Sequence, residues 1–107
     1  MADPDTELEK KLAALRRQFV ERYAARRQAI EEAATRVGID VEAVKILRGE
    51  CHKIAGTAGT FGFDALGEAA SEIEMICDRA VEVGTVLNEK ERAEINPLLI
   101  VLRKGCD

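Results

Sequence analysis

The sequence predicts an all-α protein: an antiparallel up-and-down four-helix bundle with an additional N-terminal helix. Apolar residues recur at spacings of three and four along most of the chain, which is the period of an amphipathic helix. Hydrophobic residues make up 47% of the chain and charged residues 34%, and much of the apolar part is alanine, which suits closely packed helices. Few stretches are β-branched, so no sheet is expected. The length of 107 residues predicts a single domain over 1–107.

The first helix is predicted over about residues 4–23. Asp3 and Pro4 are suited to its N-cap and first turn. An apolar stripe follows at helical spacing, made of Leu8, Leu12, Leu15, Phe19 and Tyr23. A straight continuation would place Arg26 in the core. We therefore expect a bend or break near residues 23–27, and a first bundle helix over about 25–37 that Gly38 terminates.

This N-terminal segment is rich in basic residues, but they do not form one stripe. At about 100° per residue they spread around the helix, which favours a solvated surface paired with nearby glutamates. The formal net charge of −4 also argues against nucleic acid as the main partner. No apolar run approaches the roughly 18 residues needed to span a bilayer. We expect no nucleic-acid and no membrane partner.

A cytoplasmic location is expected from the N-terminus and the cysteines. The N-terminus is polar and acidic, without the pattern of a secretion signal. The three cysteines, Cys51, Cys77 and Cys106, have no metal-binding spacing and are interpreted as reduced thiols.

The two central helices are predicted over about 41–61 and 64–83. Asp40 and Asp64 provide their N-caps, and Gly62 and Gly84 follow their ends. The first of them carries the most sustained heptad pattern in the chain, made of Val44, Leu47, Cys51, Ile54, Ala58 and Phe61.

The last helix is predicted over about 88–104. Asn88 and Glu91 have the spacing of a capping box. Pro97 either kinks this helix or begins a new one after Asn96. We prefer the kink, because the apolar stripe continues through Pro97. Short loops throughout predict that successive helices are antiparallel neighbours.

One face of the 41–61 helix gathers unusual residues around the only histidine, His52. Measured from the heptad stripe, His52 lies about 130° away from the core. The residues within about 60° of it are Lys45, Arg48, Gly49, Gly56 and Gly59. Glycine inside a helix costs roughly 1 kcal/mol relative to alanine, so these glycines need an explanation. Either they keep the imidazole open to a partner, or they permit close helix packing; the heptad pattern favours access.

The chemistry of an exposed imidazole favours a nucleophile at His52. A core histidine disagrees with its angular position, and no second histidine supports a metal site, so no metal ligand is predicted. A neutral imidazole nitrogen can attack a phosphoryl group. Lys45 and Arg48, and less directly Lys53, are placed to offset the charge that the ring would acquire.

The stretch from His52 to Phe63, followed by Leu66, Ile73 and Glu74, resembles the signature of histidine-containing phosphotransfer (HPt) domains. It is also similar to the phosphoacceptor domain of chemotaxis histidine kinases. The close match covers about a quarter of the chain. The chain departs from the family at Ala55, where a lysine is common, and Arg48 or Lys53 is a candidate replacement.

The resemblance implies a monomeric phosphorelay intermediate with His52 as phosphoacceptor and Gly56 as the small residue that admits a receiver domain. Such a protein takes a phosphoryl group from the receiver aspartate of a hybrid histidine kinase and passes it to the receiver of a response regulator. No cofactor is expected in this chain, and Mg²⁺ is expected on the partner receiver. No autonomous kinase activity is expected. Two alternatives stay open: a non-catalytic helical adapter, and an excised phosphoacceptor domain.

Overall fold

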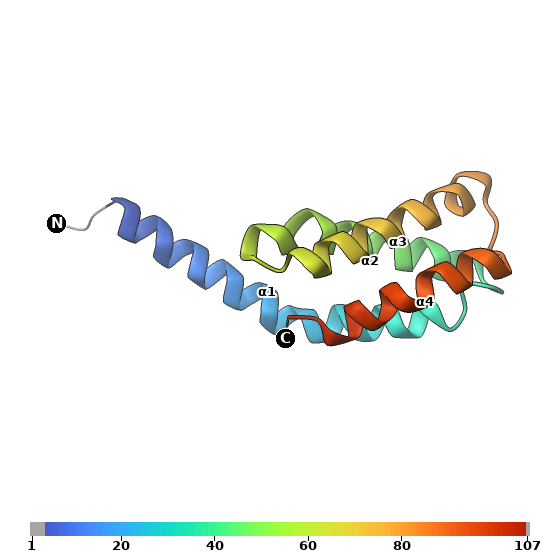
Figure 1. Cartoon of the computed structure of the whole chain (residues 1–107), viewed down its shortest axis with the longest axis horizontal. Helices are drawn as coiled ribbons and strands as arrows, with labels where there is room; N and C mark the ends of the chain where they lie inside the picture. The colour runs from blue at the N-terminus through green and yellow to red at the C-terminus, as the bar shows by residue number, and fades with distance from the viewer. Residues whose placement is uncertain (1–3, 107) are drawn as a thin grey trace.

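The computed structural model describes residues 4–106, and it confirms an all-helical fold in that range. Its helices are α1 (Pro4–Ala34), α2 (Val41–Thr57), α3 (Asp64–Val83) and α4 (Glu89–Lys104), with a short 3₁₀ turn, η1 (Ala58–Phe61), after α2. Successive helices run back and forth, and the first half of α1 projects beyond the others (Figure 1). The molecule is elongated, with extents of 58 × 24 × 19 Å.

The predicted break near residues 23–27 is wrong, because α1 is one continuous helix of 31 residues. Arg26 does not disturb the core: it is half-buried, and its guanidinium reaches Glu50 of α2 at 3.4 Å. A long side chain can thus lie along the interface with its charge paired. Tyr23 is buried beside it and donates a hydrogen bond to the Leu102 carbonyl at 2.6 Å. The predicted additional helix over 4–23 is therefore the N-terminal part of α1, and only its first turns project beyond the bundle (Figure 1).

The predicted helix over 41–61 is divided into α2 and η1. Asp40 caps its start by accepting a hydrogen bond from the Glu42 backbone N–H at 2.9 Å. After Thr57 the chain tightens to 3₁₀ geometry, and Gly62 ends it with a φ of +87°. Only glycine adopts that left-handed conformation cheaply, which explains the stop. The bend turns the chain into α3, whose bounds coincide with the prediction. The predicted N-cap is wrong, however: Phe63 occupies that position without a side-chain hydrogen bond, and Asp64 is an acidic residue inside the first turn.

The start of α4 contains the predicted capping box. The Asn88 side chain accepts from the Glu91 backbone, and the Glu91 side chain accepts from the Asn88 backbone. Glu91 also pairs with Arg79 of α3, whose Nε donates to it at 2.9 Å. The helix continues through Pro97 without a second start, so the alternative of a new helix at Asn96 is wrong.

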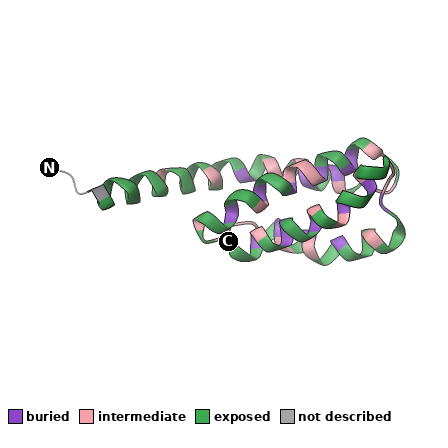
Figure 2. Cartoon of the chain, turned by 90° about the horizontal axis from the view of Figure 1, so that it is seen from above, coloured by how far each residue is buried: buried purple, intermediate pink, exposed green. Residues whose placement is uncertain are grey.

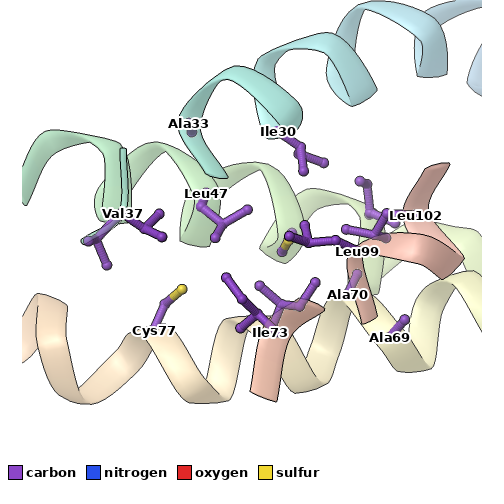
Figure 3. Packing of buried hydrophobic residues seen from close by; sticks show 14 of the residues in the cluster. Ile30, Ala33, Val37, Leu47, Ala69, Ala70, Ile73, Cys77, Leu99 and Leu102 are labelled. Atoms are coloured by element: carbon purple, nitrogen blue, oxygen red, sulfur yellow. The ribbon is translucent and has the colours of Figure 1, made fainter. Parts of the chain in front are cut away.

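The core lies between the four helices over the length of the bundle (Figures 2 and 3). It receives Ile30 from α1, Leu47 from α2, Ile73 from α3 and Leu102 from α4, each at most 1% exposed. Cys51 and Cys77 are buried free thiols. Burial raises the pKa of Cys77 to about 12, so this thiol stays protonated at neutral pH. No helix in the described range 4–106 is long and apolar enough to cross a membrane.

Candidate functional site

His52 lies in the last third of α2 with its side chain 72% exposed. The neighbouring heptad residues Cys51 and Ile54 are fully buried, so the helix fixes which side the imidazole faces. The predicted position of His52 outside the core is confirmed. An imidazole held this way on a regular helix is open to a large partner while its backbone stays fixed.

The ring of His52 is oriented by Glu74 of α3. Its Nδ1 lies 2.6 Å from Glu74 Oε2, and the Glu74 side chain is only 18% exposed. A carboxylate only accepts hydrogen bonds, so Nδ1 carries the proton and donates a hydrogen bond to Glu74. In a neutral ring this leaves Nε2 unprotonated. The nitrogen that can act as a nucleophile is therefore Nε2.

Arg48 makes a second contact of the same kind one helical turn before His52. Its Nε donates to Asp78 Oδ1 at 2.6 Å, and this hydrogen bond raises the pKa of Arg48. His52 and Arg48 are four residues apart on α2, and Glu74 and Asp78 are four apart on α3. The two pairs thus form successive cross-links between antiparallel helices. Arg48 is the predicted cation that lies on the Glu74 side of His52.

The other two predicted cations lie away from this pair of cross-links. Lys45 reaches Glu42 within α2 at 3.2 Å. Lys53 reaches Glu50 at 3.6 Å and lines a hollow between α1 and α2. Since the interface of α2 with α3 carries the His52 contact, Lys53 lies on the wrong side of α2 to share it. Of the two cations Arg48 and Lys53, Arg48 lies beside the His52–Glu74 contact and Lys53 does not.

The glycines near His52 differ in their surroundings. A Cβ built on Gly49 or Gly56 would meet nothing within 4 Å, and one on Gly59 would meet Asp64 Oδ1 at an ordinary 3.7 Å. Close helix packing therefore does not require glycine at any of these positions. Gly56 is exposed one turn after His52. Its missing side chain leaves open space beside the imidazole, which agrees with the access interpretation.

Ala55 lies half-buried on the α3 side of α2, next to a shallow hollow of about 300 Å³. The other residues that line this hollow are Gly59, Asp64, Gly67, Glu68 and Ser71. Its small residues and two carboxylates bring no cation to this part of the site. The described residues contain no group of three His, Cys, Asp or Glu side chains arranged to hold a metal ion.

Sequence reasoning does not find the contacts of Glu74 and Asp78. Glu74 belongs to the family resemblance, but no local pattern assigns it a contact, and none indicates Asp78. One signal was available: both residues lie on α3 at the four-residue spacing that Arg48 and His52 have on α2. Matching the two pairs requires the register between α2 and α3, which no local pattern gives.

Comparison with known proteins agrees with these observations. The searches of curated proteins and of solved structures returned no match. A family model described as the Hpt domain matches residues 14–103, which includes His52, Glu74 and all of α2, η1 and α3. The match begins within the projecting part of α1 and ends near the end of α4. Because it covers most of the sequence, the chain belongs to the Hpt domain family.

Proposed function

We propose that this chain is a cytoplasmic phosphorelay intermediate in which Nε2 of His52 carries the phosphoryl group. Members of the Hpt family act in phosphotransfer of two-component signalling, together with receiver domains. The observation that carries the assignment to His52 is the Nδ1 contact with Glu74. It fixes the tautomer, holds the ring, and leaves an unprotonated nitrogen on an exposed face.

In the first transfer, the lone pair of Nε2 attacks the phosphorus of a receiver aspartyl phosphate. The new N–P bond forms as the P–O bond to the aspartate breaks, and the aspartate leaves as a carboxylate. The ring becomes cationic while Nδ1 keeps its proton, and the negative charge of Glu74 stabilises that cation. The second transfer reverses these bond changes on another receiver. In-line approach of both groups is required in each step.

The partners in this proposal are the receiver of a hybrid histidine kinase as donor and the receiver of a response regulator as acceptor. The receivers supply the aspartate and the Mg²⁺ that neutralises the transferring group. This chain supplies a positioned nucleophile and a surface for docking, and the proposal assigns it no kinase activity. Gly49, Gly56 and Gly59 leave the docking surface unobstructed, because none of them adds a side chain beside His52.

Arg48 is the residue that we assign to offset phosphoryl charge where the family commonly has a lysine. It lies one turn from His52 and is already held by Asp78, whereas Lys53 is on the α1 side. Arg48→Gln is expected to slow transfer a few-fold, as is usual for loss of an exposed charge interaction. Lys53→Gln is the matched control. Equal effects of the two changes would refute this assignment.

The test is incubation of the purified chain with a receiver domain labelled on its aspartate. The parent is expected to take up an acid-labile, alkali-stable phosphate, and His52→Gln is expected to take up none. Incubation with ATP and Mg²⁺ alone is the control for kinase activity. If His52→Gln is labelled as well as the parent, the proposal fails. If neither is labelled by a broad panel of receivers, a non-catalytic adapter becomes the better explanation.

A further inference from the structure

The projecting part of α1 carries an apolar stripe that nothing in the described chain covers. Leu8 is 56% exposed, Leu12 41% and Leu15 49%. They follow one another at spacings of four and three, and Phe19 continues the stripe as a partly buried residue. Figure 2 shows this segment standing clear of the bundle. Apolar side chains gathered along one exposed helix face mark an interaction surface.

The stripe leads directly into a groove between α1 and the end of α2. Leu15 and Phe19 belong both to the stripe and to the lining of the groove. The hollow has a volume of about 350 Å³, and its other lining residues are Gln18, Arg22, Arg26, Lys53, Thr57 and Phe61. Phe19 packs against Phe61 at a ring-centroid distance of 5.6 Å, which gives the groove an aromatic floor. An amphipathic helix is the kind of segment that fits such a groove.

The rim of the groove carries an excess of positive charge. Arg26 and Lys53 share one carboxylate, Glu50, at 3.4 and 3.6 Å. Arg22 makes no ion pair within residues 4–106. The groove therefore favours an occupant that is acidic as well as apolar.

We propose that the groove binds the projecting helix of a second copy of this chain, in a symmetric antiparallel dimer. The first turn of α1 is acidic, with Asp5 and Glu7, and Glu9 follows in the next turn. Leu8 lies among these carboxylates, and the basic Lys10 and Lys11 follow them, so the acidic character is confined to the first two turns of α1. These two turns combine the apolar and acidic character that the groove requires, and each copy offers both surfaces, as a two-fold interface demands.

The stripe also fixes a register for this pairing. If Leu12 of one helix faces Leu15 of the other, Leu8 faces Phe19 and Asp5 faces Arg22. Every apolar residue of the stripe then has an apolar partner, in the alternating spacing of an antiparallel two-helix coil. His52 stays outside the interface, because its contact is with α3 whereas the groove lies between α1 and α2. The sequence alone predicts a monomer, since it does not show that this stripe is uncovered.

The experiment is sedimentation equilibrium of the intact chain over a wide range of concentration, with the fold of each variant checked by circular dichroism. The parent is expected to approach twice the chain mass of 11.7 kDa. Leu12→Glu is expected to remain a monomer at every concentration. Ile100→Glu is the matched control, because Ile100 is 51% exposed on α4, away from the stripe, and it should dimerise like the parent.

A charge exchange tests the register. Asp5→Lys and Arg22→Glu are each expected to weaken dimerisation by about a hundredfold, because the two-fold dimer contains this contact twice and each loss is worth about tenfold. The two changes together should recover most of the loss. Failure to recover it would overturn the antiparallel register.

A parent that stays monomeric throughout would overturn the dimer itself. In that case, slower phosphoryl transfer in Leu12→Glu would show that the stripe docks a receiver. Binding of the parent to vesicles of anionic lipid, lost in Leu12→Glu, would show that the stripe docks a membrane. Sedimentation does not depend on phosphorylation. A monomeric parent would therefore not refute the proposed function, and a parent that takes up no phosphate would not refute the dimer.

Discussion

The chemistry of His52 depends on a residue that lies 22 positions away in the sequence. An imidazole on a helix surface exchanges its proton between two nitrogens, and it can turn about its side-chain bonds. The 2.6 Å contact of Nδ1 with the partly buried Glu74 removes both freedoms. Glu74 is thus a positioning residue, and its negative charge is also placed to stabilise the phosphorylated ring.

Replacement of Glu74 should slow phosphoryl transfer without unfolding the protein. Glu74→Ala removes the acceptor of the Nδ1 proton, and about a tenfold loss in transfer rate is expected from one charge-assisted hydrogen bond. Glu74→Gln keeps an acceptor but loses the charge, so its rate should lie between Ala and the parent. The rates are measured by quenched-flow mixing with a phosphorylated receiver.

Glu72→Ala is the control for this change, because Glu72 is an exposed residue of the same helix. Imidazole nitrogen NMR gives a readout that a merely structural role would not alter. The share of the tautomer protonated at Nδ1 should fall in Glu74→Ala. An unchanged tautomer together with an unchanged rate would remove Glu74 from the mechanism.

Gly56 offers a separate test of access to the imidazole. A Cβ at this position meets nothing within 4 Å, so Gly56→Ala should stabilise the fold by up to about 1 kcal/mol. Gly56→Leu should also fold, since the added side chain points into open space. That side chain would occupy the approach to His52, and transfer from a receiver should fall at least tenfold.

The matched control for Gly56→Leu is Ala93→Leu, which adds a leucine at an exposed position of α4. Thermal melts and transfer assays on the same samples separate stability from access. If Gly56→Leu is as active as the parent, the open space beside His52 is not needed by the partner.

At the scale of the residue, the sequence predicts the exposed histidine but not its hydrogen bond. The heptad stripe of α2 is local, and it determines the direction of His52 without any knowledge of α3. The contact with Glu74 depends on how α2 and α3 slide against each other, which is set by packing of residues such as Ile54 and Ile73 across the interface. A pattern read along one helix cannot give that register.

At the scale of the element, caps and glycines predict most helix boundaries. Asp40 and Asn88 mark helix starts through side-chain hydrogen bonds, and Gly62 and Gly84 mark helix ends through a left-handed backbone. The predicted break in α1 failed for a different reason. Arg26 has an apolar stem long enough to lie at the interface while its charge reaches Glu50. A charged residue on an apolar stripe therefore did not require the helix to bend.

The start of α4 should make the stability of the protein depend on pH. Hydrogen bonds from Arg79, together with the backbone of Asn88, hold the pKa of Glu91 below its ordinary value. A carboxyl with a lowered pKa in the folded state stabilises the fold fully above its ordinary pKa. That contribution is lost as the pH falls through the lowered pKa.

Glu91→Gln should therefore cost about 1 kcal/mol at pH 7 and less in acid. The free energy of unfolding, measured with urea from pH 7 to about pH 3, should show the parent and the variant converging at the acid end. Glu89→Gln is the control, since Glu89 is an exposed residue of the same turn. A constant difference between parent and Glu91→Gln across this range would contradict the role given to the Arg79 pair.

At the scale of the whole molecule, the chain divides into a bundle and a projecting helix end. The bundle holds the core, and the projecting end adds exposed leucines but no core residue before Tyr23. Arg16 connects the projecting end of α1 to the bundle. Its Nε donates a hydrogen bond to the Phe61 carbonyl at 3.2 Å, and its guanidinium lies over the ring of Phe63. Exposure of the leucines could not be predicted from the sequence, because their spacing is the same as that of a buried stripe.

This division predicts how the chain responds to removal of residues 1–13. The remaining chain keeps Arg16, the core and the whole of the 14–103 range that matches the Hpt family. Its melting temperature at low protein concentration should equal that of the intact chain, because residues 5–13 are all exposed in one copy. As the protein concentration rises, the melting temperature should increase for the intact chain only, because association stabilises the folded state by mass action. Calorimetry of both chains over a concentration series measures this. A lower melting temperature of the shortened chain at every concentration would show instead that the projecting end stabilises its own bundle.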